Sequence, residues 1–209
     1  MKLTIFGATG KTGQHLVKQA LAAGHEVIAL ARTPSKLAID NPHLKVVQGD
    51  MLDAAKVEAA VQGAEAVLSV LGPRKGNPEF AVTKGTENIL NAMQKHGVKR
   101  LIISAGAGVG DPNDTPKPIN HFISFMIKTL AKDAYHDMLE VAKKVRESST
   151  DWTIVRVPML TDQPAQGTLR IGWVGNGTGP RLSREDMAAF MLKQISDDTY
   201  VRQAPVISN

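Results

Sequence analysis

Residues 6–13 read Phe6-Gly7-Ala8-Thr9-Gly10-Lys11-Thr12-Gly13, and this stretch decides the fold. It separates an apolar run at residues 2–6 from a helical pattern that begins at residue 14. In such a loop the first glycine permits a tight turn, the second lets the backbone approach a pyrophosphate, and the third lets the helix pack closely on the strand. The N–H groups at the start of the helix then face the phosphates. We therefore expect Gly7 to Gly13 to bind a dinucleotide.

The same alternation of strand and helix continues along the chain. Because the strand patterns are continuously apolar, we expect both faces of the sheet to be buried under helices. The sequence thus predicts an α/β fold, a single doubly wound Rossmann domain with a mostly parallel sheet, over residues 1–209, with a small substrate-side extension from about residue 158. The predicted strands are residues 26–31, 44–48, 66–70, 99–104, 152–157, 169–174 and 204–207, and the predicted helices are 14–23, 54–61, 79–96, 119–147 and 185–195.

The composition excludes several classes of protein. Hydrophobic residues make up 43% of the 209 residues, which is too many for a disordered chain. There is no cysteine, and the six histidines form no His-x3-His pair, so we expect no metal site. The net charge of +5 comes from scattered basic residues, which argues against nucleic-acid binding. No apolar run is long enough for a membrane span or a signal peptide, so we expect a cytoplasmic protein. A monomer or a homodimer is the expected oligomeric state.

A P-loop is one alternative interpretation of the same stretch. Gly10-Lys11-Thr12 resembles the end of the P-loop of nucleoside triphosphate hydrolases. That motif needs a glycine five residues before Gly10, where this chain has Ile5 inside the first predicted strand. The loop is therefore too short to wrap a triphosphate. A glycine turn without any ligand is the other alternative, and the strand and helix on either side argue against it.

The end of the second predicted strand indicates which dinucleotide binds. Enzymes that use NAD usually place an acidic residue there, about 20 residues beyond the glycines, to hold the ribose hydroxyls. Here the strand runs into Arg32, and Lys36 follows within one turn. A guanidinium group forms charge-assisted hydrogen bonds with a 2′-phosphate, and the lysine adds a second positive charge. The sequence predicts NADP (as NADPH) rather than NAD, although a solvated arginine in a loop is the simpler alternative.

These motifs resemble the atypical short-chain dehydrogenase/reductase superfamily, which includes NmrA-like proteins, and within it the biliverdin-IXβ and NADPH-flavin reductases. The resemblance covers nearly the whole chain. The glycine-rich motif at residues 5–13 is shared by many members of the superfamily, whereas the Asp-Gln-Pro segment at residues 162–164 is more specific. The matching stretches are residues 5–13, 30–32, 49–52, 70–74, 85–89, 146–148, 161–164 and 190–192.

The resemblance implies a set of cofactor contacts at the carboxyl ends of the strands, where open parallel sheets bind ligands. For Asp50 the alternative is an ordinary turn residue before a helix. The implied contacts are Asp50 and Met51 beside the adenine, Leu71, Gly72 and Arg74 on the ribose side, Ser104 and Ala105 beside the nicotinamide, and Pro158, Met159 and Leu160 on its other side.

The catalytic residues are less clearly marked. Ordinary short-chain dehydrogenases use a Tyr-x3-Lys pair, but Tyr135 is followed four residues later by Leu139. Ser104 and Tyr135 are the candidates for contact with substrate, with core packing as the alternative for the tyrosine. Arg156 stands two residues before Pro158, whereas many members of the superfamily have Arg-Pro adjacent. Because the Tyr-x3-Lys pair is missing, the alcohol–ketone chemistry of ordinary short-chain dehydrogenases is disfavoured.

The missing Tyr-x3-Lys pair favours acceptors that take hydride without a strong protein acid. Flavins, quinones and bilins are conjugated rings of this kind, so the sequence predicts an NADPH-dependent reductase that acts on one of them. The alternatives are an NADP(H)-binding redox sensor without turnover, and an isomerase or dehydratase that recycles its cofactor. The candidates for the wall of the acceptor pocket are large apolar residues, Phe122, Phe125, Met126 and Trp173.

Overall fold

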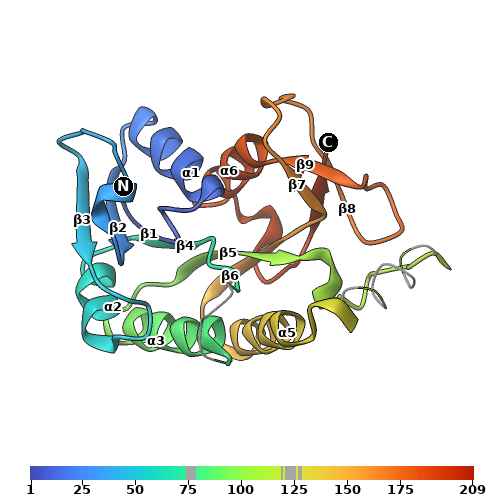
Figure 1. Cartoon of the computed structure of the whole chain (residues 1–209), viewed down its shortest axis with the longest axis horizontal. Helices are drawn as coiled ribbons and strands as arrows, with labels where there is room; N and C mark the ends of the chain where they lie inside the picture. The colour runs from blue at the N-terminus through green and yellow to red at the C-terminus, as the bar shows by residue number, and fades with distance from the viewer. Residues whose placement is uncertain (74–78, 119, 121–125, 127–128) are drawn as a thin grey trace.

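An eight-stranded sheet runs through the centre of the protein in the order β3-β2-β1-β4-β5-β6-β10-β8 (Figure 1). The computed structural model describes residues 1–73, 79–118, 120, 126 and 129–209. The chain adds β2 and β3 on one side of β1 and then β4, β5 and β6 on the other, which is the predicted doubly wound order. The strands are β1 (Lys2–Phe6), β2 (Glu26–Ala31), β3 (Leu44–Gln48), β4 (Ala66–Ser69), β5 (Arg100–Gly106), β6 (Asp151–Val157), β8 (Arg170–Gly172) and β10 (Val206–Ser208).

Only the pairing of β10 with β8 in this sheet is antiparallel among the described strands, so the predicted mostly parallel sheet is confirmed. Helices cover both faces, with α1 and α6 on one side and α2, α3 and α5 on the other (Figure 1). The chain therefore has three layers. The helices are α1 (Lys11–Ala22), α2 (Ala54–Val61), α3 (Ala81–Lys95), α5 (Lys132–Glu147) and α6 (Arg184–Lys193).

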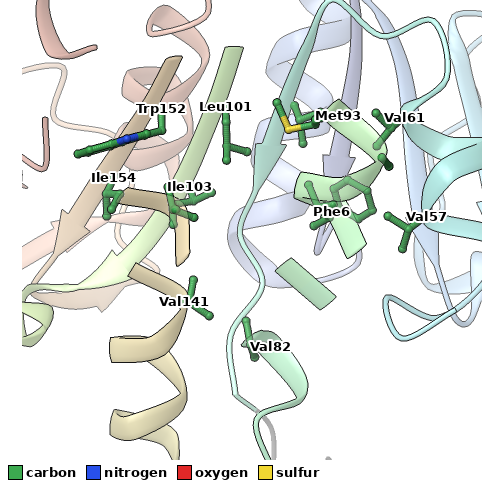
Figure 2. Packing of buried hydrophobic residues seen from close by; sticks show 14 of the residues in the cluster. Phe6, Val57, Val61, Val82, Met93, Leu101, Ile103, Val141, Trp152 and Ile154 are labelled. Carbon is green, nitrogen blue, oxygen red and sulfur yellow. The ribbon is translucent and has the colours of Figure 1, made fainter. Parts of the chain in front are cut away.

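The central strands β2, β1, β4, β5 and β6 contribute side chains to the core on both faces of the sheet. In β1, Ile5 packs on the α1 and α6 side, while Phe6 packs on the side of α2, α3 and α5. Figure 2 shows part of the core on the side of α2, α3 and α5, with Phe6 from β1, Leu101 from β5 and Val141 from α5. This two-sided burial is the physical reason why the strands read as continuous apolar runs.

Residues 158–183 hold more regular structure than the sequence indicates. Besides β8, which is shorter than the predicted strand at 169–174, they contain β7 (Met159–Thr161) and β9 (Arg181–Ser183). These two strands pair in parallel as a separate two-stranded sheet. A strand of three residues carries no readable period, and its partner lies about 20 residues away, so only the folded chain reveals the pairing.

The start of α3 also depends on a distant residue. Phe80 precedes the helix with a φ of 54° and supplies no side-chain cap. The carboxylate of Asp137, on α5, accepts hydrogen bonds from the backbone N–H groups of Val82 at 3.1 Å and Thr83 at 2.8 Å. The hydroxyl of Thr83 donates to the same carboxylate at 2.7 Å. A buried side chain of one helix thus caps its neighbour and fixes the two helices together.

A membrane-spanning helix and a metal-binding cluster are both absent from the described part of the chain. In that part of the chain no helix is both long enough and apolar enough to cross a bilayer. Within the same residues, no three acidic, histidine or cysteine side chains gather closely enough to hold a metal ion. Three of the predicted site and wall residues, Arg74, Phe122 and Phe125, lie outside the described residues.

Candidate cofactor site

The glycine-rich loop has the geometry that its three glycines predict. Gly7 has a φ of 80°, and a Cβ atom on it would lie 2.8 Å from the carbonyl oxygen of Val70. The N–H of Gly10 donates to the carbonyl oxygen of Gly7 at 3.0 Å and closes the turn. A Cβ atom on Gly13 would lie 2.2 Å from that same oxygen. The third glycine therefore lets α1 rest directly on the loop, as predicted.

The start of α1 is suited to an anion. Gly10 occupies the N-cap position in an extended conformation and has no side chain with which to cap the helix. By contrast, Asp53 caps α2 and Ser183 caps α6 with side-chain oxygens. The first turn of α1 contains no acidic residue. Its backbone N–H groups and the positive end of the helix dipole are therefore available to a phosphate group.

A cleft extends from this loop along the carboxyl ends of β1, β2, β3 and β4. Five of the residues that line this cleft were not predicted from the sequence, namely Phe6, Leu30, Ala31, Gly49 and Val70. Ala8 and Thr12, which were also predicted, are buried and do not line the cleft. The predicted residues that do line the cleft are Gly7, Thr9, Arg32, Asp50, Met51, Leu71 and Gly72.

Arg32 lies at the rim of this cleft, directly after β2. Its Nε atom is 3.7 Å from a carboxylate oxygen of Asp50, and 54% of its side chain is exposed. Asp50 also accepts a hydrogen bond from the backbone N–H of Leu52 at 2.9 Å, which holds the turn after β3. An exposed pair of this kind contributes little to stability, so Arg32 is able to exchange this partner for another anion. Lys36 is exposed in a short 3₁₀ turn (Pro34–Lys36) and does not line the cleft.

Met51 is held in the cleft by α3. A Cβ atom on Gly85 would lie 2.8 Å from the Cγ atom of Met51, so only glycine at this position leaves room for the methionine. The side-chain amide of Asn88, one turn further along, donates to the carbonyl oxygen of Met51 at 3.0 Å. Gly85 and Asn88 belong to the motif at residues 85–89, to which the sequence assigned no role. The structure gives it one, since it fixes the turn after β3.

The Asp-Gln-Pro segment lies beside the glycine-rich loop. Asp162 accepts hydrogen bonds from the Nζ atom of Lys11 at 2.5 Å and from Arg184 at 2.6 Å. The hydrogen bond from Lys11 is the main cause that holds the pKa of Asp162 below its ordinary value, and the charge of Arg184 adds to it. Lys11 thus pairs with a carboxylate from the carboxyl-terminal part of the chain in this structure.

The residues predicted to flank the nicotinamide lie at the ends of the next two strands. Ser104 is half-buried and Ala105 is buried near the carboxyl end of β5, which pairs with β6. Pro158 follows β6 directly. In β7, Leu160 packs against the core on the α1 and α6 side, whereas Met159 is 58% exposed. Because β5 and β6 follow β4 in the sheet, these positions continue the edge that carries the cleft.

Tyr135 and Trp173 lie near a loop that sequence analysis left unassigned. The hydroxyl of Tyr135, on α5, donates to the carbonyl oxygen of Gly108 at 3.3 Å. The ring of Trp173 lies 5.8 Å from the guanidinium carbon of Arg156. Met126, another predicted wall residue, is 39% exposed.

Arg156 forms a buried ion pair that the sequence did not reveal. Its side chain has no exposed surface, and its two terminal nitrogens donate to the two carboxylate oxygens of Asp114 at 2.7 and 2.8 Å. Its Nε atom donates to the carbonyl oxygen of Ala204 at 2.6 Å. Asp114 accepts further hydrogen bonds from the N–H groups of Val174 at 3.0 Å and Asp111 at 2.8 Å. The guanidinium and carboxylate therefore satisfy each other in the bidentate geometry that burial requires.

Comparison with known protein families agrees with the glycine-rich loop and the cleft. A family model described as NAD(P)H-binding matches residues 7–198. The chain belongs to the NAD(P)H-binding family. The match begins at Gly7, the first glycine of the loop, and extends past α6. The family match thus confirms the resemblance to NAD(P)-binding proteins.

The chain is also similar to individual proteins and to solved structures. An uncharacterized chloroplastic protein of Arabidopsis thaliana is 30% identical over 182 residues, or 80% of this chain. The chain spans 62% of the length of that relative. A short-chain dehydrogenase/reductase of Veillonella parvula, solved in complex with NADP, has a TM-score of 0.83 at 21% identity and covers 100% of this chain and 94% of its own. ChuY of Escherichia coli O157:H7, described as an anaerobilin reductase, has a TM-score of 0.77 at 22% identity and covers 100% and 97%.

The residues of this NAD(P)H-binding chain fit a dinucleotide. Glycine at positions 7 and 13 keeps the backbone of the loop clear of Cβ atoms, and the uncapped start of α1 provides N–H donors for a pyrophosphate. The cleft continues from there to Arg32 on one side and to Leu71 and Gly72 on the other. These features were predicted from the sequence. The packing of Met51 against Gly85 and the Asp114–Arg156 ion pair were not predicted.

The Asp114–Arg156 pair predicts a dependence of stability on pH. Burial of Asp114 opposes its ionisation, but the hydrogen bonds from Arg156, Val174 and Asp111 outweigh it and hold its pKa below its ordinary value of 3.8. The pair therefore stabilises the fold above that ordinary value, and its contribution is lost as the pH falls through the lower pKa of the folded state. We expect Asp114→Asn to lower the free energy of unfolding by about 3 kcal/mol at neutral pH.

Urea unfolding of the wild type and of Asp114→Asn across the acid range tests this prediction. The difference between the two should be largest near neutral pH and should shrink toward zero in acid, because the protonated carboxyl resembles the amide. An exposed carboxylate, Asp40→Asn, serves as the control and should show little difference at any pH. A difference for Asp114→Asn that stays constant down to acid pH would contradict the prediction.

Proposed function

We propose that this protein is an NADPH-dependent reductase that transfers hydride to a conjugated ring acceptor, namely a flavin, a quinone or a bilin. The observation that carries the proposal is Arg32, a cation at the rim of a cleft that begins at a dinucleotide-binding loop. An acidic residue at this place would repel a 2′-phosphate, whereas a guanidinium binds it through charge-assisted hydrogen bonds. Membership of the NAD(P)H-binding family supports the cofactor class. The Veillonella parvula structure in complex with NADP supports the choice of NADP.

Different residues along the carboxyl edge of the sheet bind different parts of the cofactor. Gly7, Gly10 and Gly13 bring the backbone to the pyrophosphate, and Arg32 binds the 2′-phosphate. Ser104 lies at the end of the strand where we assign the nicotinamide, and it orients the ring. When bound, the cofactor supplies the hydride. The protein's part is to hold the ring and the acceptor in contact and to exclude water around them.

The choice of acceptor rests on what α5 lacks. Leu139 stands four residues after Tyr135, where a Tyr-x3-Lys enzyme has its lysine. The hydroxyl of Tyr135 donates instead to the carbonyl oxygen of Gly108. Acceptors whose rings take hydride directly, with solvent as the source of the proton, need no such pair. The anaerobilin reductase description of ChuY adds weight to a bilin among the three classes.

The test offers FMN, a quinone and a bilin in turn and follows the absorbance of the reduced nicotinamide. We expect NADPH oxidation that depends on the acceptor and is much slower with NADH. The binding of NADPH is measured in parallel by fluorescence. Tight binding of NADPH without turnover of any acceptor would contradict the reductase and favour a redox sensor. Conversion of a substrate without net loss of NADPH would favour an isomerase or dehydratase.

A further inference from the structure

The loop at residues 107–115 and the turn at residues 173–176 are joined into one unit, although they lie about 60 residues apart. The N–H of Thr115 donates to the carbonyl oxygen of Val174 at 2.9 Å, and the N–H of Val174 donates to the carboxylate of Asp114 at 3.0 Å. A Cβ atom on Gly175 would lie 1.9 Å from the carbonyl oxygen of Thr115. The two backbones therefore touch, and only a glycine permits that approach.

Arg156, on β6, contacts both the loop and the turn. Its Nη1 atom reaches the carbonyl oxygen of Ala107 at 3.4 Å, at the start of the loop, as well as Asp114 near its end. The ring of Trp173 lies against its guanidinium group. One buried cation thus contacts both ends of the loop and the beginning of the turn.

Helix α5 holds the middle of the same loop. The carbonyl oxygen of Gly108 accepts from the hydroxyl of Tyr135, and that of Gly110 accepts from Arg146 at 2.6 Å. Arg146 also lies 3.6 Å from the carboxylate of Asp111. Side chains from α5 and β6 therefore hold the backbone of the loop at three residues, Ala107, Gly108 and Gly110. They also contact the carboxylates of Asp111 and Asp114.

Stability alone is a poor explanation for the buried pair. Apolar side chains of similar volume often stabilise a core at least as well as a buried ion pair does. What the pair adds is a defined position for a loop of polar and glycine residues, which has little apolar surface of its own to bury. The position matters because Ala105 pairs in register with Arg156 on the neighbouring strand. The loop thus leaves the sheet directly after Ser104 and Ala105.

We infer that Asp114 and Arg156 are positioning residues that fix loop 107–115 and turn 173–176 as the wall of the acceptor pocket. This inference rests on the proposed reductase function, since it assigns the acceptor to the ends of β5 and β6. Of the cofactor we assign only the nicotinamide to the end of β5, and the groups that would bind its phosphates and adenine lie in the cleft at the ends of β1 to β4. Loosening the pair therefore weakens the binding of the acceptor and leaves the binding of NADPH unchanged.

The experiment compares Asp114→Asn and Arg156→Lys with a matched control, Arg100→Lys. Arg100 is also buried, and it donates to the carbonyl oxygens of Gln194 and Asp151, but at the amino end of β5. All three variants should lose stability. For the two variants of the pair we expect the KM for the acceptor to rise about 10-fold, with the Kd for NADPH within a factor of about two. For Arg100→Lys both constants should stay within about twofold of the wild type.

Amide hydrogen exchange adds a readout that requires no turnover. Exchange in residues 107–115 and 173–176 should accelerate in Asp114→Asn and Arg156→Lys but not in Arg100→Lys. Gly175→Ala, which pushes the turn away from Thr115 without removing a charge, should have the same effects as Asp114→Asn. An acceptor KM that stays at the wild-type value in Asp114→Asn, as in Arg100→Lys, would overturn the inference.

The result also separates this inference from the proposed function. If the wild type binds NADPH but reduces no acceptor, the proposed function fails. The Kd for FMN is then measured on protein saturated with NADP⁺, and a rise of about 10-fold in Asp114→Asn supports the inference. An equal Kd for FMN in the two proteins, or no binding of FMN to the wild type, overturns it.

Discussion

Replacing Gly13 with alanine is expected to destabilise the protein by about 3 kcal/mol or more and to weaken NADPH binding by about 100-fold. In most helix positions this substitution would be stabilising, because alanine has a higher helix propensity than glycine by about 1 kcal/mol. Here the added Cβ atom would lie 2.2 Å from the carbonyl oxygen of Gly7, which belongs to the backbone and has no rotamer by which to move aside. The helix must then shift away from the loop, and its N–H groups leave the pyrophosphate.

Thermal unfolding and NADPH titration by fluorescence check this expectation. Gly106→Ala is the matched control, because Gly106 has a φ of −65° and no atom within 4 Å of the position of an added Cβ. The control should change the free energy of unfolding by no more than about 0.5 kcal/mol and leave NADPH affinity as it is. A Gly13→Ala protein with wild-type stability and affinity would show that α1 does not rest on the loop.

Replacing Arg32 with aspartate is expected to reverse the cofactor preference, with the ratio of NADPH to NADH affinity falling by about 100-fold or more. Loss of the charge-assisted hydrogen bonds to a 2′-phosphate costs about 1.5–3 kcal/mol, which is about 10- to 150-fold in affinity. The introduced carboxylate then repels the phosphate and also lies beside Asp50, which loses its cationic partner at 3.7 Å. The same carboxylate is able to accept hydrogen bonds from the free ribose hydroxyls of NADH.

Titration of both cofactors by fluorescence measures this preference without any acceptor, so the test holds for a reductase and for a sensor alike. Arg32→Gln should give an intermediate ratio, because it removes the charge without adding repulsion. Arg170→Ala is the control, since Arg170 is an exposed arginine on β8, at the opposite edge of the sheet from β3. If Arg32→Asp left the ratio unchanged, the arginine would be an ordinary solvated residue and the assignment of NADPH would be wrong.

The sequence by itself determined the parts of this protein whose causes are local. Continuous apolar strands predict a sheet buried on both faces, and GxxGxxG between a strand and a helix predicts the turn at Gly7 and the packing at Gly13, because backbone sterics act within a few residues. Arg32 was identifiable for the same reason, since it directly follows β2 at the carboxyl edge where open parallel sheets bind ligands. The family match begins at this local pattern and extends over residues 7–198.

Only the tertiary structure decided which distant groups meet. Asp137 caps a helix that begins more than 50 residues earlier, and Gly85 makes room for Met51. Asp114, in the loop after β5, binds Arg156 on β6. Nothing in the sequence near these residues marks their partners, because a hydrogen bond or a close contact depends on atomic positions and not on separation along the chain. Periodicity also fails for the three-residue strands β7 and β9, whose partners lie far along the chain. The glycine-rich loop and Arg32 were therefore readable from the sequence, whereas the contact between loop 107–115 and turn 173–176 emerged only from the fold.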